Sequence, residues 1–188
     1  MPAPAFPSRI STTYFCAGCR WRMDASIAEE LTSEDLRYFT LDVNRCKDGG
    51  MIEDRCFCGT VRYRIQEPVK FVAHDHCSIC RRIAGAAFVT WFGVQDESQF
   101  ELVSGTDALT TFASSAEATR QFCRQCGSHL FFRSSRWPGE VHITLASVTH
   151  GAESLIPLAH VFYSDRVPWC AIEDALPKLG GPSGVMPL

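Results

Sequence analysis

The chain has 188 residues, of which 46% are hydrophobic and 21% charged, and these fractions are ordinary for a soluble globular protein. The formal net charge of −3 gives no electrostatic reason to propose a nucleic-acid partner. No uncharged apolar run is long enough to predict a membrane span. The chain does not begin with a charged segment followed by an apolar one, so we expect a cytoplasmic protein rather than a secreted one.

Residues 1–50 are predicted to form an N-terminal extension. They begin Pro-rich and contain a short predicted helix, whose start carries Ser26 and Glu29 in the spacing of a capping box. The turn sequence CKDGG at 46–50 indicates the boundary with the next domain. An extension of this length suggests two roles, a cover over a catalytic cleft or a contact in a homodimer.

Residues 51–180 are predicted to form a mainly β domain. The segment TVRYRI at 60–65 alternates apolar and charged residues, as a half-buried strand does. One short helix is expected from Ser78 to Gly85, and residues 181–188 are expected to form a flexible tail. Further strand candidates, rich in β-branched and aromatic residues, are AFVTWFGV at 87–94, LTTFA at 109–113, HLFFR at 129–133, VHITLA at 141–146 and LAHVFY at 158–163.

The ten cysteines are the unusual feature of the composition. In a chain of this size without a secretory signal, closely paired cysteines indicate metal binding. Cys56 and Cys58 have CxC spacing, while Cys123 and Cys126 have CxxC spacing followed by Gly127, which suits a turn with positive φ. Together these cysteines supply four thiolates, the ligand set of a closed structural zinc site. The alternative is four separate buried cysteines, which the paired spacing disfavours.

A third pair, Cys77 and Cys80, lies in the segment VAHDHCSICRRIAG at 72–85. If the residues before it are extended, Asp75 shares a face with Cys77 and gives a third ligand. Three protein ligands with an open position are the pattern of a catalytic zinc. His74 and His76 are rival third ligands, because histidine is the more common zinc partner and strand alternation does not exclude His74.

A third zinc site is a further prediction, with Cys16, Cys19 and Cys46 as ligands and Cys170 or a histidine as the fourth. A redox disulfide between Cys16 and Cys19 is one alternative, since CxxC supports one, and reduced cysteines packed in the extension are another.

Five stretches in this order resemble the glutathione-dependent formaldehyde-activating enzyme family, which includes centromere protein V-like proteins: CFCGTVRY, DHCSICRRIAGA, WFGV, FCRQCGSHLFFR and HVFYSDRVPWCAIEDALPKL. The resemblance covers roughly residues 51–180 and implies a β-tent of curled antiparallel sheets. It also implies a structural zinc on Cys56, Cys58, Cys123 and Cys126. The family's second zinc would fall on residues 75–80, where the family pattern is Cys-His-Cys-x-x-Cys.

The first cysteine of that pattern is replaced by Asp75 in this chain. The position favours Asp75 over either histidine as the third ligand of the second zinc, beside Cys77 and Cys80. A carboxylate is a harder ligand than a thiolate and donates less electron density, so we expect a stronger Lewis acid and a more weakly held ion.

The expected function is therefore a zinc-dependent carbon–sulfur lyase-like enzyme that acts on a thiol adduct of a small aldehyde or a related electrophile. The resemblance implies glutathione as the thiol, while Asp75 favours a divergent substrate or a related lyase, dehydration or hydrolysis reaction. His76 is a candidate proton carrier, with His74 and an unbound Asp75 as alternatives. Arg81 and Arg82 are candidates for holding an acidic substrate group, and their alternative is a solvated helix face.

Two other functions are compatible with the same residues. A zinc-binding module would recruit a thiol or a protein partner without turnover. A redox sensor would use the surplus cysteines. Among the aromatic residues, Trp91 and Phe92 are expected in the core more than in a cleft, and His160 and Trp169 are expected to be structural.

Overall fold

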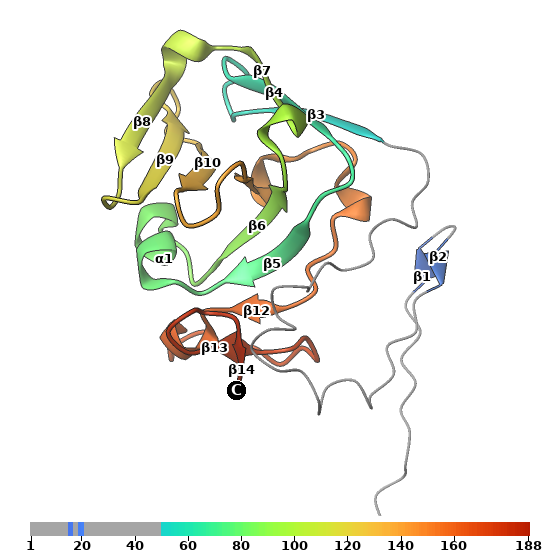
Figure 1. Ribbon diagram of the computed structural model, residues 1–188, viewed down its shortest axis with the longest axis vertical. Helices are drawn as coiled ribbons and strands as arrows, with labels where there is room; N and C mark the ends of the chain where they lie inside the picture. The colour runs from blue at the N-terminus through green and yellow to red at the C-terminus, as the bar shows by residue number, and fades with distance from the viewer. Residues whose placement is uncertain (1–14, 17–18, 21–49) are drawn as a thin grey trace, which may run out of the picture.

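The computed structural model describes residues 15–16, 19–20 and 50–188 (Figure 1). The first four of these residues form a backbone hairpin of strands β1 (Phe15–Cys16) and β2 (Cys19–Arg20). The predicted helix near Ser26 lies outside the described residues, and so does the predicted third zinc site, which needs the side chains of residues 16, 19 and 46. Both stay predictions.

Seven strands form the larger sheet, in the order β12-β5-β6-β11-β10-β9-β8. All neighbouring pairs are antiparallel except β12 and β5, which are parallel, with His160 opposite His74. This sheet is confirmed as the mainly antiparallel scaffold expected of a β-tent. Its strands are β5 (Phe71–Asp75), β6 (Val89–Val94), β8 (Leu109–Ala113), β9 (Ala118–Cys123), β10 (His129–Ser134), β11 (Val141–Thr144) and β12 (His160–Val161).

A second sheet of three strands has the order β3-β4-β7, with β3 (Met51–Arg55), β4 (Arg62–Gln66) and β7 (Phe100–Ser104). Its central strand shows why the alternating sequence predicts a strand: Tyr63 and Ile65 are buried, while Arg64 turns outward between two carboxylates. The Arg64 guanidinium pairs with Glu53 on β3, and its Nη1 lies 2.9 Å from Glu101 on β7. These cross-strand pairs lie on the exposed side of the sheet, where each contributes at most about 1 kcal/mol.

The hydrophobic core lies between the two sheets and holds most of the buried aromatic side chains. Tyr63 of the smaller sheet meets Phe131 of the larger one edge to face, with ring centroids 5.1 Å apart. Phe100 packs on the same Phe131 ring at 4.8 Å. Phe92 is a fully buried member of this core. Trp91 is also buried, with 4% of its surface exposed, but it packs on His129 on the face of the larger sheet that points away from this core. Trp91 and Phe92 therefore point to opposite faces of the sheet.

The predicted helix is confirmed as α1 (Ser78–Ala84), which ends at Gly85 in the left-handed conformation. Six predicted strand segments overlap with β4, β6, β8, β10, β11 and β12. Within residues 50–188, β3, β7, β9, β13 and β14 were not predicted, and β5 was considered only as a conditional extended stretch before Cys77. Within 158–163 only β12 is extended, because Phe162 adopts φ 51° and turns the chain. The described residues contain no helix long and apolar enough to span a membrane. Short 3-10 helices occur at Glu97–Gln99, Thr106–Ala108, Leu145–Ser147, Ala152–Ser154 and Tyr163–Asp165.

The C-terminal segment folds back beside β5, as Figure 1 shows. Its last strands, β13 (Leu179–Gly180) and β14 (Met186–Pro187), pair as a small antiparallel hairpin. The Phe162 N–H donates to the Gly184 carbonyl at 2.7 Å. Residues 181–188 therefore have defined partners, and their expected flexibility stays a prediction about motion.

Candidate metal centres

The structure brings the four cysteines of the first predicted site together. Cys56 and Cys58 lie in the turn after β3, Cys123 ends β9, and Cys126 lies in the following turn. All four sulfur atoms lie within 4.8 Å of one another. Gly127 has φ +74°, the positive value predicted for this turn. We call this set the four-cysteine cluster; it joins the smaller sheet to the larger one.

The donor set of the four-cysteine cluster fits zinc. A tetrahedral ion with Zn–S bonds of about 2.3 Å places its sulfurs about 3.8 Å apart. The Cys56–Cys58 and Cys58–Cys123 sulfur pairs are separated by 3.4 and 3.8 Å. A hydrogen bond from Ser128 lowers the pKa of Cys126 to about 5, whereas burial raises the pKa of Cys56 to about 11. The cluster thus mixes an easily ionised thiol with one that needs a cation to ionise.

The second predicted site is assembled where β5 ends and α1 begins. One carboxylate oxygen of Asp75 and the sulfurs of Cys77 and Cys80 lie within 4.8 Å of one another. The Cys77 backbone N–H donates to Asp75 Oδ1 at 2.7 Å, which holds the carboxylate at the entrance of the helix. Asp75 and Cys80 are 8% and 6% exposed. We call these three residues the three-donor cluster; a carboxylate and two thiols suit zinc as well.

The two thiols of the three-donor cluster differ in acidity. A hydrogen bond from Cys80 lowers the pKa of Cys77 to about 6, and backbone N–H groups of the first helical turn act in the same direction. That same hydrogen bond and burial raise the pKa of Cys80, and burial raises the pKa of Asp75. Cys77 is thus the thiol most readily ionised here, and a cation would be needed to hold all three groups as anions.

Both rival histidines lie away from the three-donor cluster, on the other side of β5. His74 Nδ1 is 2.8 Å from Thr90 Oγ1. His76 Nε2 is 2.8 Å from His160 Nδ1, and His160 Nε2 is 2.9 Å from the Asp174 carboxylate. Strand alternation explains this separation, since residues 74 and 76 share the face opposite to residue 75.

The Asp174 carboxylate determines the tautomers in this chain of hydrogen bonds. It accepts a hydrogen bond from His160 Nε2–H. In a neutral His160 ring Nδ1 then accepts from His76 Nε2–H, and His76 Nδ1 is left with a lone pair. That atom is buried and has no hydrogen-bond partner among the described residues. Burial is the main cause that lowers the pKa of His76 to about 4, which keeps the ring neutral at pH 7.

The two arginines after Cys80 have different surroundings. Arg81 Nε donates to the His76 carbonyl at 2.8 Å, and its Nη2 donates to the Asp165 carbonyl at 2.7 Å. Arg81 therefore ties α1 to the C-terminal segment through backbone atoms. Arg82 is exposed on the helix surface. Their predicted contact with an acidic substrate group stays a prediction.

Sequence reasoning missed two residues of this region: Arg120 on β9, which contacts the three-donor cluster, and His129 on β10, which lies near Arg120. Arg120 Nη2 donates to Cys80 Sγ at 3.4 Å. His129 packs edge to face on Trp91 at 5.2 Å and has two buried ring nitrogens without partners among the described residues. Neither β9 nor the burial of Arg120 was predicted, because a lone arginine among polar residues gives no hydrophobic signal.

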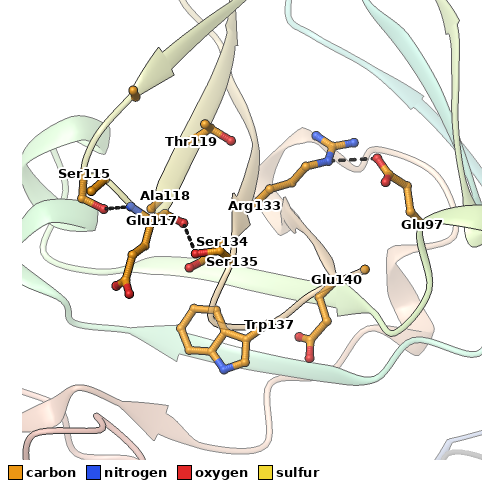
Figure 2. Close-up of a pocket in the computed structure, with 13 residues that line it drawn as sticks. Glu97, Ser115, Glu117, Ala118, Thr119, Arg133, Ser134, Ser135, Trp137 and Glu140 are labelled. Carbon is orange, nitrogen blue, oxygen red and sulfur yellow. Dashed lines mark hydrogen bonds and ion pairs between the residues drawn. The ribbon is translucent and has the colours of Figure 1, made fainter.

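A separate polar cleft of about 280 Å³ lies where β9 begins and β10 ends (Figure 2). Its charged groups have partners in the protein: Arg133 Nε is 3.2 Å from Glu97, and Glu140 is 2.6 Å from Lys70. Glu117 lies 3.3 Å from Arg136. None of the predicted ligands lines this cleft. The thiol and carboxylate donors make the two cysteine clusters the better candidates for chemistry.

Residues 51–165 match the family model described as "Glutathione-dependent formaldehyde-activating enzyme". The chain belongs to this family. The matched region contains both cysteine clusters, Arg120 and His160, and it ends before Asp174. The family resemblance read from the sequence motifs is thereby confirmed.

The chain is similar to several known proteins, and each match covers a different share of its length. A Halomonas elongata protein whose name carries the family designation is 25% identical over 130 residues, which cover 66% of this chain and 82% of that protein. An "Uncharacterized lyase" of Schizosaccharomyces pombe is 32% identical over 116 residues, 61% of this chain and 80% of that protein. A crystal structure of a Rhodobacter sphaeroides protein superposes with a TM-score of 0.45 and 22% identity, over 53% of this chain and 89% of that one.

Proposed function

We propose that this family member is a zinc-dependent carbon–sulfur lyase that acts on a thiol adduct of a small aldehyde, with glutathione as the leading thiol. The family designation of the Halomonas relative and the lyase name of the Schizosaccharomyces relative support this class of reaction. The observation that carries the proposal is the contrast between two clusters in one chain, one with four protein donors and one with three.

The four-cysteine cluster would hold a structural zinc, and Asp75, Cys77 and Cys80 would hold a second zinc. When bound there, a zinc ion supplies a position that stabilises a thiolate or polarises an oxygen. Asp75 makes the donor set harder than the family's three cysteines would. That difference favours a more weakly held ion and leaves room for a related substrate or a dehydration or hydrolysis reaction.

The proposed chemistry balances without a further reactant. In the direction of adduct formation, the thiolate sulfur attacks the aldehyde carbon, and the carbonyl oxygen takes up the proton that the thiol has lost. In the opposite direction the carbon–sulfur bond breaks and the proton returns to sulfur. His76 stays the proposed proton carrier, because its neutral ring offers a lone pair on Nδ1, and its ring lies on the other side of β5 from the three donors.

Zinc content and adduct turnover test the proposal together. We expect two zinc ions per chain, with the second lost in Cys77→Ser, and accelerated exchange between glutathione, formaldehyde and their adduct in the wild type alone, observed by NMR. One zinc per chain that is unchanged in Asp75→Ala, together with no acceleration, would favour the zinc-binding module. The predicted cytoplasmic location and the predicted homodimer are separate questions, for imaging and for sedimentation.

A further inference from the structure

Arg120 is a buried cation beside the three-donor cluster. Its residue is 4% exposed. Nη2 donates to Cys80 Sγ at 3.4 Å, Nε donates to Ser114 Oγ at 3.2 Å, and the guanidinium carbon lies 4.7 Å above the centre of the Phe132 ring. Nη1 is buried and has no hydrogen-bond partner in the described part of the chain.

The guanidinium lacks the partner that usually accompanies a buried arginine. Among residues 50–188, no carboxylate oxygen lies within the 4.0 Å that defines an ion pair with Arg120. Arginine does not lose its proton in proteins, and an unmatched buried charge is strongly unfavourable. The group in direct contact with the Arg120 guanidinium is Cys80, one of the proposed zinc ligands.

The four-cysteine cluster provides a comparison within the same molecule. Its sulfur atoms have neutral polar neighbours: Thr60 Oγ1 lies 3.3 Å from Cys58 Sγ, and Ser128 Oγ lies 3.2 Å from Cys126 Sγ. Of these sulfur contacts, the one with a cation, from Arg120 to Cys80, belongs to the three-donor cluster. A site with four protein ligands only holds its ion, whereas a site with three must also accommodate the charge of the ligand that takes the fourth position.

Counting charges shows what Arg120 does. Asp75, Cys77 and Cys80 as anions contribute −3, a divalent ion +2 and Arg120 +1, so the loaded centre is neutral. Without Arg120 the centre would carry −1 and would repel an anion. We infer that Arg120 is a specificity-determining residue whose fixed charge makes the centre accept an anionic thiolate rather than a neutral ligand. This inference rests on the proposed function, since it takes the three-donor cluster as the place where the thiol binds.

The test measures ligand binding without turnover, in protein whose zinc has been replaced by Co²⁺. The visible absorption of the cobalt protein is followed while 2-mercaptoethanol, which binds as a thiolate, or imidazole, which binds as a neutral donor, is added. The variants are Arg120→Gln, which keeps a hydrogen-bond donor without the charge, and Arg120→Lys, which keeps the charge. Arg133→Gln is the matched control, because Arg133 also lies over an aromatic ring, that of Phe100, at 5.1 Å.

We expect Arg120→Gln to weaken thiolate binding at least about ten-fold and to change imidazole binding less than about two-fold, because only the thiolate brings a charge. Arg120→Lys should recover most of the thiolate affinity, and Arg133→Gln should behave as the wild type. Retained cobalt at the four-cysteine cluster and an unchanged melting temperature show that a variant is folded.

The outcomes separate the inference from the proposed function. Equal thiolate affinity in Arg120→Gln and the wild type overturns the inference alone, as does an equal loss of thiolate and imidazole binding. Thiolate binding that depends on Arg120, in a wild-type protein without adduct turnover, supports the inference and overturns the lyase. A wild type that binds no thiol overturns both.

Discussion

Asp75 is the residue at which this chain departs from the three-cysteine pattern of its family, and its carboxylate is held by the backbone N–H of Cys77. We expect Asp75→Cys to bind zinc at the three-donor cluster about ten-fold or more tightly than the wild type, because a thiolate is a softer and more strongly donating ligand. Competition with a coloured chelator measures this affinity.

A control for the added thiol is Asp107→Cys, which places a cysteine on an exposed 3-10 helix. Its zinc affinity should equal that of the wild type. An Asp75→Cys protein that binds the second zinc no more tightly would mean that the carboxylate is not a ligand.

His129 is, with His76, one of the histidines whose protonation should make the fold sensitive to acid. Burial, and then the charge of Arg120, lower its pKa from 6.5 to about 4. Between pH 6.5 and 4 the unfolded chain binds the proton and the folded chain does not, so the free energy of unfolding falls as the pH falls through this window. At about 1.4 kcal/mol per pKa unit, the loss reaches roughly 3 kcal/mol.

Replacing His129 by Phe should remove this part of the decline, since the phenyl ring keeps the contact with Trp91 and cannot take up a proton. Urea unfolding at a series of pH values gives the slope. His150→Phe, at an exposed position, should leave the slope unchanged. An equally steep decline in His129→Phe would show that other groups cause it.

Among the elements, the turn between β7 and the 3-10 helix Thr106–Ala108 should tolerate little change. Gly105 has φ +83°, and a Cβ atom there would lie 2.3 Å from the carbonyl oxygen of Thr60, close to the four-cysteine cluster. We expect Gly105→Ala to lower the free energy of unfolding by about 2 kcal/mol or more, since positive φ and a backbone clash add.

Gly151→Ala separates the two causes, because Gly151 also has positive φ, +76°, but has open space where its Cβ atom would be. It should cost only about 1 kcal/mol by urea unfolding. Equal losses at Gly105 and Gly151 would exclude a contribution from the contact with Thr60.

The elements also show where sequence reasoning succeeds. Alternation in residues 60–65 and the glycine at residue 85 correctly predicted β4 and the end of α1, because both signals are local. The strand β9 was missed, since ATRQFC mixes polar and apolar residues and its burial depends on neighbouring strands. The partner of β5 was missed for the same reason: the pairing with β12 joins residues far apart in the chain.

At the scale of the whole molecule, the two cysteine clusters should differ in their effect on folding. The four-cysteine cluster joins both sheets, so Cys123→Ser should unfold or aggregate the protein, whereas Cys80→Ser should leave a folded and inactive one. Circular dichroism together with zinc content per chain distinguishes these outcomes. If both variants unfold alike, the division into a structural and a catalytic zinc is wrong.

The same distinction between local and distant contacts explains which parts of the candidate site could be predicted from the sequence. The cysteine spacings alone bring Cys56 near Cys58 and Cys77 near Cys80, and strand alternation adds Asp75. Arg120 and His160 reach this region only through the folded sheet, so no local pattern identifies them. Their burial is a property of the three-dimensional arrangement rather than of any segment.

The parallel pairing of β12 with β5 has a consequence for synthesis on the ribosome. His76 and His160 share a hydrogen bond although 84 positions separate them in the chain. While the nascent polypeptide still lacks residues 160–161, β5 has emerged without its parallel partner. The backbone edge of β5 thus stays unpaired during translation until β12 docks, and we expect this interval to be when that edge pairs most readily with another chain.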